Sequence, residues 1–171
     1  MASVTRVPHV PQAPADRPPS VIEYADTADL ADVRAMMQEY AAWIGSDLSF
    51  QGFARELEHL PGEYAPPDGV LLVARQAGGI TGMVAMRRRD ARRSEMKRLF
   101  VRPAGRGIGL GHALATRVIQ EARARGYQEM VLDTLPIMGR AQEMYVALGF
   151  RDIDPYYPSP IAGTRYMSLT L

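Results

Sequence analysis

The sequence has 171 residues, with 20 lysines and arginines against 19 aspartates and glutamates, so its formal net charge is +1. This near balance argues against a dominant role on nucleic acid or on an anionic membrane, because both need a strong positive field. There is no cysteine, which excludes disulfides and thiolate chemistry, and His9, His59 and His112 have no metal-ligand spacing. The N-terminus holds no continuous apolar segment, so we expect a cytoplasmic protein with no membrane partner.

Residues 1–20 differ in composition from the rest of the chain. Five prolines interrupt them and no apolar periodicity is present. Such a segment cannot bury enough apolar surface to offset the entropy lost on ordering. We therefore predict a disordered proline-rich arm over residues 1–20 and one folded domain over residues 21–171; a partner-binding role for the arm stays open.

The domain is expected to begin with a strand and two helices. Val21–Tyr24 reads as a short strand, and Thr27 is placed to cap the N-terminus of a long helix that Gly45 ends. Phe53–Leu60 is expected to form a second, shorter helix. Pro61–Gly69 follows as a loop because proline and glycine disfavour regular structure there.

Three strands follow this loop. Val70–Arg75 and Ile80–Arg87 form a predicted hairpin around Ala77–Gly79, and a second turn at Asp90–Arg93 leads into the strand Ser94–Val101. Pro103 cannot continue that strand because it lacks a backbone N–H.

The last part of the chain alternates helices and strands. Gly107–Arg125 carries the clearest helical periodicity, with Gly126 placed just after its C-terminus. The remaining expected elements are the strand Glu129–Thr134, the helix Met138–Leu148, and the strands Phe150–Ile153 and Thr164–Leu171. Strands in runs, with helices between some of them, predict an α/β (α+β) domain with a mixed, mostly antiparallel sheet. The crossover through Gly107–Arg125 should make one strand pair parallel.

A glycine-rich loop joins the strand at Val101 to the following helix. Glycines let the backbone approach a ligand closely, and the N–H groups at a helix N-terminus favour anions such as a pyrophosphate. The loop is not a P-loop, because Gly111 is followed by His112 and Ala113 where that motif needs Lys and then Ser or Thr. It is not a dinucleotide fingerprint either, because His112 occupies the position of the third glycine.

The segment Arg106-Gly-Ile-Gly-Leu-Gly111 matches the Gln/Arg-x-x-Gly-x-Gly/Ala loop of the GNAT N-acetyltransferase superfamily. The resemblance extends over about residues 21–171 and includes Glu95–Val101, Leu132-Asp-Thr, and the helix that contains Ala141 and Tyr145 before Leu148-Gly-Phe. It implies a sheet of six to seven strands with about four helices, splayed between the fourth and fifth strands. It also implies acetyl-CoA as cosubstrate and no metal.

The resemblance assigns the cofactor residues by position. The strand before the loop would pair with the pantetheine arm, and the loop amides would hold the pyrophosphate. Met138 stands where many relatives carry a pantetheine-binding asparagine, so that contact departs from the family pattern. The implied cofactor-binding residues are Leu99, Phe100, Val101, Arg106, Gly107, Ile108, Gly109, Leu110, Gly111, His112, Met138 and Ala141.

Two residues are candidates for proton transfer. Tyr145 matches the family tyrosine that donates a proton to the leaving thiol, although it also lies on the apolar stripe of its helix, as a core tyrosine would. Glu95 matches the position of a catalytic glutamate in histone-type relatives, and we expect its side chain on the same face as Lys97, Leu99 and Val101. An exposed carboxylate paired with an arginine is the alternative for Glu95.

The acceptor is expected to be the amine of a small molecule or of a protein. By analogy with the family, Trp43, Tyr40 and Phe53 are candidates for its pocket, with core packing as the alternative. Tyr156 and Tyr157 lie in a loop that would face the same region. Many relatives are dimers, so the resemblance is compatible with a homodimer.

Three functions are considered. The leading one is transfer of an acetyl group from acetyl-CoA to a primary amine in a ternary complex. The alternative is a non-catalytic acyl-CoA-binding sensor or scaffold of the same fold. An RNA-binding role through the basic run Arg87, Arg88, Arg89, Arg92 and Arg93 is disfavoured, because no aromatic residues are interleaved for base stacking.

Overall fold

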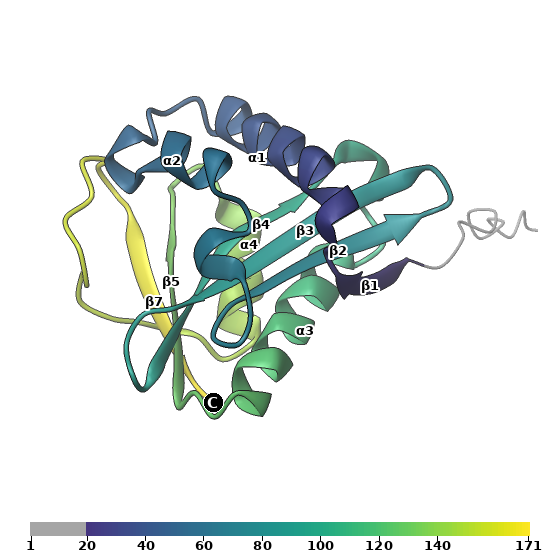
Figure 1. The fold of residues 1–171 in the computed structure, drawn as a ribbon. Coiled ribbons are helices and arrows are strands. Elements are labelled where there is room, and N and C mark those ends of the chain that lie inside the picture. The colour runs from purple at the N-terminus through teal and green to yellow at the C-terminus, as the bar shows by residue number, and fades with distance from the viewer. Residues whose placement is uncertain (1–19) are drawn as a thin grey trace, which may run out of the picture.

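A computed structural model describes residues 20–171, and the predicted arm lies outside the described residues except for Ser20. In the described part of the chain, seven strands form one sheet in the order β1-β2-β3-β4-β5-β7-β6 (Figure 1). All neighbouring strands are antiparallel except β4 and β5, which are parallel. The strands are β1 (Val21–Tyr24), β2 (Val70–Gln76), β3 (Gly79–Arg88), β4 (Arg93–Val101), β5 (Glu129–Thr134), β6 (Arg151–Asp152) and β7 (Arg165–Thr170). The expected mixed and mostly antiparallel sheet is confirmed.

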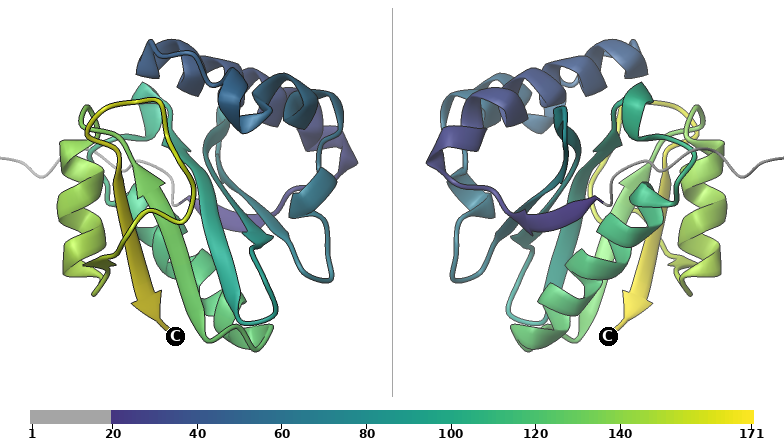
Figure 2. Two further views of the ribbon diagram at one scale, coloured as in Figure 1. Left: turned by 90° about the vertical axis from the view of Figure 1, so that its left-hand side faces the viewer. Right: turned by 90° about the vertical axis from the view of Figure 1, so that its right-hand side faces the viewer.

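Helices cover both faces of this sheet. The four α-helices of the described residues are α1 (Leu30–Ile44), α2 (Phe53–Glu58), α3 (Leu110–Ala124) and α4 (Gly139–Ala147). Helices α1 and α2 lie on one face, and α3 and α4 lie on the other (Figure 2). The molecule is therefore a three-layer arrangement with the sheet in the middle.

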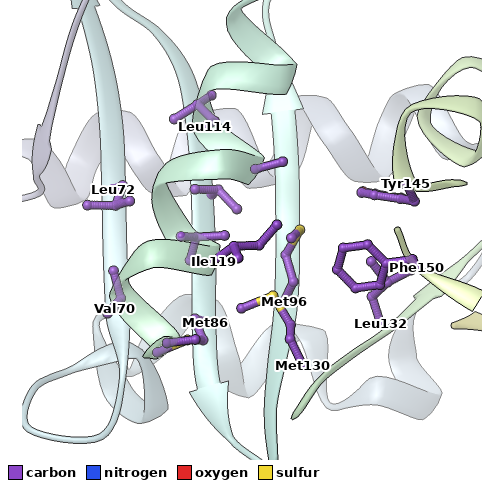
Figure 3. Close-up of a cluster of buried hydrophobic side chains, with 14 of the residues drawn as sticks. Val70, Leu72, Met86, Met96, Leu114, Ile119, Met130, Leu132, Tyr145 and Phe150 are labelled. Carbon is purple, nitrogen blue, oxygen red and sulfur yellow. The ribbon is translucent and has the colours of Figure 1, made fainter. Parts of the chain in front are cut away.

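The sheet separates two apolar cores. Alternate residues of β2 point to opposite faces, so Leu72 joins the core under α3 and α4 while Val73 joins the core under α1. Figure 3 shows the α3–α4 core, in which Leu114 and Ile119 of α3 pack over the strands. Tyr145 of α4 lies in this core at the side away from β2.

The helix N-termini differ from the expected ones. Asp26, and not Thr27, makes the cap before α1: its carboxylate accepts hydrogen bonds from the backbone N–H groups of Ala28 and Asp29. The three residues Thr27–Asp29 form a 3-10 turn, so α1 itself begins at Leu30. Helix α3 begins at Leu110 rather than at Gly107. The reason is local, because the backbone before Leu110 adopts left-handed conformations that cannot belong to the helix.

Strands β4 and β5 separate after a short paired stretch. Their parallel register covers Arg93↔Glu129, Ser94↔Met130 and Glu95↔Val131 only, although β4 runs on to Val101 and β5 to Thr134. Beyond Glu95 the two strands splay, as expected, and β5 keeps its pairing with β7 along its whole length. The splay opens a gap in the middle of the sheet.

A β-bulge interrupts β4 inside this splayed stretch. Arg98 has a φ of 56°, a left-handed value that is uncommon for a residue other than glycine, and the pairing with β3 shifts register at the same place. The extra residue reverses the side-chain alternation of the strand. Glu95 and Lys97 share one face, but Leu99 and Val101 pack into the α3–α4 core, so the expectation that all four share a face is wrong.

Candidate active site

A cavity of about 790 Å³ occupies the splay between β4 and β5. Its wall includes Tyr145 and most of the residues predicted to bind the cofactor. These are Leu99, Phe100, Val101, Arg106, Gly107, Gly109, Leu110, Gly111, His112, Met138 and Ala141. Ile108 and Glu95 do not line it. The cavity thus joins three segments that are far apart in sequence: β4, the glycine loop with the start of α3, and the start of α4.

The glycine loop offers backbone groups to one end of the cavity. Gly107 and Gly109 have φ values of 83° and 74°, which side-chain-bearing residues rarely adopt, and a Cβ on either would meet no protein atom within 4 Å. The space in front of these two glycines is therefore open to a ligand. The N–H groups of the first turn of α3 have no partner inside the helix, and Ala113 makes the first helical bond, to Gly109 O at 3.0 Å. This arrangement fits an anionic phosphate group.

Two polar side chains accompany the loop. Arg106 donates from Nε to Val101 O at 3.0 Å, which ties the loop to the end of β4. His112 is exposed on the first turn of α3, and its Nδ1 lies 3.5 Å from Thr116 Oγ1. Met138 immediately precedes α4, where the Thr134 hydroxyl donates to its sulfur at 3.6 Å.

Tyr145 of α4 is one of the residues that line the cavity. Its side chain is 7% exposed, and its ring packs edge-on against Phe150 with centroids 5.6 Å apart (Figure 3). Burial raises the pKa of its hydroxyl above 10, and the charges of Tyr40 and Asp133 add to the rise. The phenol therefore keeps its proton at neutral pH. Within residues 20–171 the hydroxyl makes no hydrogen bond, so it is available to a ligand in the cavity.

Glu95 is fully buried behind the cavity wall. Its Oε2 accepts a hydrogen bond from Arg87 Nε at 2.7 Å, and its Oε1 accepts one from the Tyr156 hydroxyl at 2.9 Å. The Lys97 ammonium lies 3.8 Å from the same Oε1. An arginine partner was the alternative expected for this residue, but the carboxylate is not exposed. Of these three neighbours of Glu95, Lys97 also lines the cavity, whereas Arg87 and Tyr156 do not.

A second carboxylate, which the sequence interpretation did not single out, faces the cavity directly. Asp133 on β5 accepts a hydrogen bond from Lys97 Nζ at 3.3 Å and another from the Tyr157 hydroxyl at 3.0 Å. Lys97 belongs to β4, so this ion pair bridges the splay two residues beyond the last backbone pairing. Lys97 could have been identified as a site residue from the sequence, because it lies two residues after Glu95 and therefore on the same face of the strand. Asp133 stands in the segment Leu132-Asp-Thr, which was part of the family resemblance but was given no role there.

The bulge residue Arg98 anchors the neighbouring segments. Its guanidinium donates to both carboxylate oxygens of Glu56, at 3.0 and 2.7 Å, and to Gln51 Oε1 at 3.0 Å. Tyr64 also donates to Glu56, at 2.6 Å. Burial alone would raise the pKa of Glu56, but the hydrogen bond and positive charge of Arg98 outweigh it and hold the pKa below 4.5. The rings of Tyr40 and Phe53 lie 5.8 and 5.1 Å from the guanidinium carbon.

The end of α1 brings apolar side chains to the cavity. Trp43 and Tyr40 line it, and Trp43 remains 44% exposed, whereas Phe53 packs under Arg98 and does not line it. Leu48 and Leu135 form a buried cluster with Ile44 beside them. Ile137, 55% exposed, completes this part of the wall. Tyr156 and Tyr157 contribute through their hydroxyls to the polar network rather than to the lining.

Two further observations concern alternative sites. Among residues 20–171, no group of three or more His, Asp or Glu side chains is arranged to hold a metal ion. No helix in the same range combines the length and apolar character that crossing a membrane requires. Most of the basic run at the β3–β4 turn is held by nearby acceptors: Arg87 by Glu95, Arg88 by Asp68 and Arg93 by Asp90.

Comparison with known proteins identifies the family. The family model "Acetyltransferase (GNAT) family" matches residues 33–150, which is more than half of the chain. The chain belongs to the GNAT acetyltransferase family. An uncharacterized N-acetyltransferase of Schizosaccharomyces pombe is 41% identical over 145 residues, covering 84% of this chain and 89% of the relative. The resemblance predicted from the glycine loop is therefore confirmed.

Solved GNAT structures share the fold. A GNAT acetyltransferase from Staphylococcus aureus Mu50 superposes with a TM-score of 0.75 at 20% identity, covering 89% of this chain and 99% of that one. A protein from Salmonella typhimurium, solved with its cofactor acetyl-CoA, gives a TM-score of 0.63 at 22% identity, with coverage of 88% and 93%. At these identities the likeness establishes the common fold.

Proposed function

We propose that this GNAT protein transfers the acetyl group of acetyl-CoA to a primary amine, with both substrates bound at once. The observation that carries the proposal is one continuous cavity in the splay whose lining includes the glycine loop, Tyr145 and Asp133. Acetyl-CoA supplies an acetyl group already activated as a thioester. The chain has to bind it, hold the amine next to it and move two protons.

The glycine loop and the first turn of α3 are proposed to hold the pyrophosphate through backbone N–H groups. The open space in front of Gly107 and Gly109 supports this assignment, because a phosphate can approach the backbone there without meeting a side chain. Leu99, Phe100 and Val101 line the same cavity along the stretch of β4 that pairs with β3 but not with β5. Their backbone is available to pair with an extended ligand because β5 has diverged.

Tyr145 is proposed as the acid that protonates the departing thiolate. Its raised pKa keeps the proton on the phenol until a basic atom comes within reach. A thiol near pKa 8.5 is a moderate leaving group at neutral pH, so a positioned donor speeds its departure. The fixed packing against Phe150 holds the ring while the hydroxyl faces the cavity.

Glu95 is proposed as the final proton acceptor for the amine. Because it does not line the cavity, we propose that the proton first meets Asp133 and passes through the Lys97 ammonium, which lies 3.3 Å from Asp133 and 3.8 Å from Glu95. Lys97 gives one proton to Glu95 and takes one from Asp133, so its charge is unchanged. The amine nitrogen is left neutral as it forms the amide.

The test is a panel of amines incubated with acetyl-CoA, in which release of free CoA thiol is measured. Thiol release that depends on both the enzyme and one class of amine supports the proposed function. A calorimetric titration with acetyl-CoA alone provides the binding constant. Tight acetyl-CoA binding without thiol release on any amine would indicate a sensor or scaffold instead.

A further inference from the structure

The acceptor end of the cavity carries three charged side chains, and their pairing determines what they can bind. We define this end by the lining residues that α1 and the loop after it, β4 up to the bulge, and the end of β5 with the following turn contribute: Tyr40, Trp43, Leu48, Gln51, Lys97, Arg98, Asp133, Leu135 and Ile137. The basic side chains Arg106, His112 and Arg140 also line the cavity, at the glycine loop and the first turns of α3 and α4. The question is whether Lys97 or Arg98 can receive a negatively charged group of the acceptor.

Arg98 cannot, because its charge is already compensated. Both Glu56 oxygens accept from it, Gln51 takes a third N–H, and its side chain is 2% exposed between the rings of Tyr40 and Phe53. Drawing it toward a ligand would leave the Glu56 carboxylate buried without its partner, which is energetically costly.

The positive charge of Lys97 is compensated by two carboxylates. Its ammonium lies between the Asp133 and Glu95 carboxylates, and its side chain is 6% exposed. A carboxylate on the acceptor that came close to Lys97 would also lie beside Asp133, which is 3.3 Å from the Lys97 ammonium, and like charges at short range repel. Within the described residues, the acceptor end therefore offers no cation for an acidic acceptor.

Asp133, unlike Lys97 and Arg98, can still form hydrogen bonds with a ligand. Each of its oxygens accepts one hydrogen bond, from Lys97 and from Tyr157, and a carboxylate oxygen has two lone pairs. One acceptor site on each oxygen is thus left, and the side chain lines the cavity near Tyr145, whose pKa it helps to raise. An amine nitrogen can donate a hydrogen bond to Asp133, and the carboxylate can take up the proton that the nitrogen must lose before it attacks.

The remaining wall of the acceptor end is apolar. Leu48 and Leu135 are buried, while Trp43 and Ile137 leave 44% and 55% of their surfaces exposed at the edge. Exposed aromatic and branched side chains in a concave site are typical of surfaces that bury an apolar ligand. Covering them would remove apolar area from water and so contribute to affinity.

On the basis of the proposed function, we propose that the acceptor is a primary amine on an apolar or aromatic body without a neighbouring carboxylate, with its nitrogen on Asp133 and its body on Trp43 and Ile137. Amino acids and acidic amines are then poor acceptors. Their carboxylate would find no partner, because Lys97 and Arg98 are already neutralised by carboxylates of the protein. The selectivity follows from charge and does not require a steric clash.

The matched probes are phenethylamine and phenylalanine, which differ by one carboxylate. Trp43 is the single tryptophan of the chain, so its fluorescence reports occupancy of this end without turnover. In the presence of free CoA, which carries no acetyl group to transfer, phenethylamine should change the fluorescence and bind at least about 50-fold more tightly than phenylalanine, since an unpaired charge is strongly rejected. Equal binding of the two probes, or no binding of phenethylamine, would overturn the proposal.

Variants test the two contacts separately. Asp133→Asn should weaken phenethylamine binding by about 10-fold or more, because the amide oxygen that replaces the carboxylate lacks the charge that strengthens a hydrogen bond. The matched control is Asp152→Asn, the same change at an exposed carboxylate paired with Arg165, and it should leave binding unaltered. Ile137→Asp should weaken phenethylamine more than it weakens butylamine, which has a smaller apolar body. An unchanged Kd for phenethylamine in Asp133→Asn would refute the role of Asp133.

Turnover separates this proposal from the proposed function. If CoA is released with polyamines or amino acids but not with phenethylamine, the enzyme is an acetyltransferase and the acceptor class proposed here is wrong. If phenethylamine changes the Trp43 fluorescence but no amine releases CoA, the acceptor class holds and the proposed function fails.

Discussion

At the glycine-loop end of the cavity the groups offered to a ligand are backbone amides, whereas at the acceptor end they are side chains from β4, β5 and the end of α1. The first end depends on a contiguous segment, Arg106–Gly111, and on two glycine conformations within it. The second depends on Lys97, Asp133 and Trp43, which only the folded sheet brings together. Backbone recognition tolerates changes in nearby side chains, while a side-chain network fails when one member is lost.

The largest expected effect lies where the two ends meet. Tyr145→Phe removes a hydroxyl without a protein partner in the described chain, so packing against Phe150 and stability should change little. We expect kcat to fall by about 10²–10⁴-fold, the usual worth of a positioned proton donor, with a nearly constant KM for acetyl-CoA. Steady-state kinetics on the identified acceptor measures this. The control is Tyr127→Phe, which changes a tyrosine of the same core that does not line the cavity and should leave the kcat of the enzyme unaltered. Normal turnover of Tyr145→Phe would mean that Tyr145 is only a packing residue.

The next effect tests how far the acceptor end depends on one ion pair. Glu56→Gln leaves the buried Arg98 charge uncompensated and should lower the free energy of unfolding at pH 7 by about 3 kcal/mol. Because the pKa of Glu56 is lower in the folded state than its usual 4.5, the pair stabilises the protein above that pH. The stabilisation is lost as the pH falls through the folded value. Urea unfolding at neutral and acidic pH should show the difference between wild type and variant shrinking in acid; a constant difference would contradict this account.

A glycine substitution tests the backbone end. Gly109→Val forces a branched side chain into a left-handed conformation, at a cost of roughly 1–2 kcal/mol, and places it where a phosphate would lie. Acetyl-CoA affinity should fall by about 10–100-fold, the worth of hydrogen bonds to a charged group. Calorimetry gives the Kd and a thermal melt confirms folding.

Gly111→Val sharpens the same test. Its φ is not left-handed and its Cβ would lie 3.9 Å from Val101, so a loss of affinity there reflects a blocked approach rather than a strained loop. Gly78→Val, in the open turn between β2 and β3, is the control. Unchanged affinity in both loop variants would remove the phosphate assignment.

Glu95→Gln tests whether the acceptor end moves a proton beyond Asp133. We expect kcat to fall most at low pH, by about 10-fold or more, because more of the amine is protonated there and needs a base. Affinity for acetyl-CoA should hardly change, since Glu95 does not line the cavity. The measurement is kcat against pH for wild type and variant. Parallel profiles would leave Glu95 as the structural partner of Arg87.

The smallest effect is expected outside both ends. Arg88 and Asp68 form an ion pair at 3.4 Å with both side chains half-exposed, and such pairs contribute little. Arg88→Ala should change the free energy of unfolding by less than about 0.5 kcal/mol and leave acetyl-CoA affinity unaltered. Urea unfolding and calorimetry set this baseline. If the wild type binds a polynucleotide in a salt-dependent way and Arg88→Ala abolishes this binding, the basic run at the β3–β4 turn has a nucleic-acid-binding function instead.

The backbone end could be predicted from the sequence because its signal is local. Helical and strand periodicity placed the elements to within a few residues, and the glycine spacing before α3 marked the loop. The helix start was misplaced at Thr27 because an aspartate one residue earlier competes for the same cap. The segment Leu132-Asp-Thr was noticed, but the role of Asp133 within it could not be predicted, since that role comes from facing Lys97 across the splay and contacts between distant strands leave no local pattern.

The bulge at Arg98 constrains how β4 can vary in length. Before it the strand presents Glu95 and Lys97 to the α1 side, and after it Leu99 and Val101 face α3. Deleting one residue here would exchange the faces of everything that follows, and would move the Phe100 ring from the α1 core toward α3. Insertions or deletions between Glu95 and Val101 are therefore tolerable only in pairs. A redesign of the acceptor end should change side chains and keep the residue count of this strand.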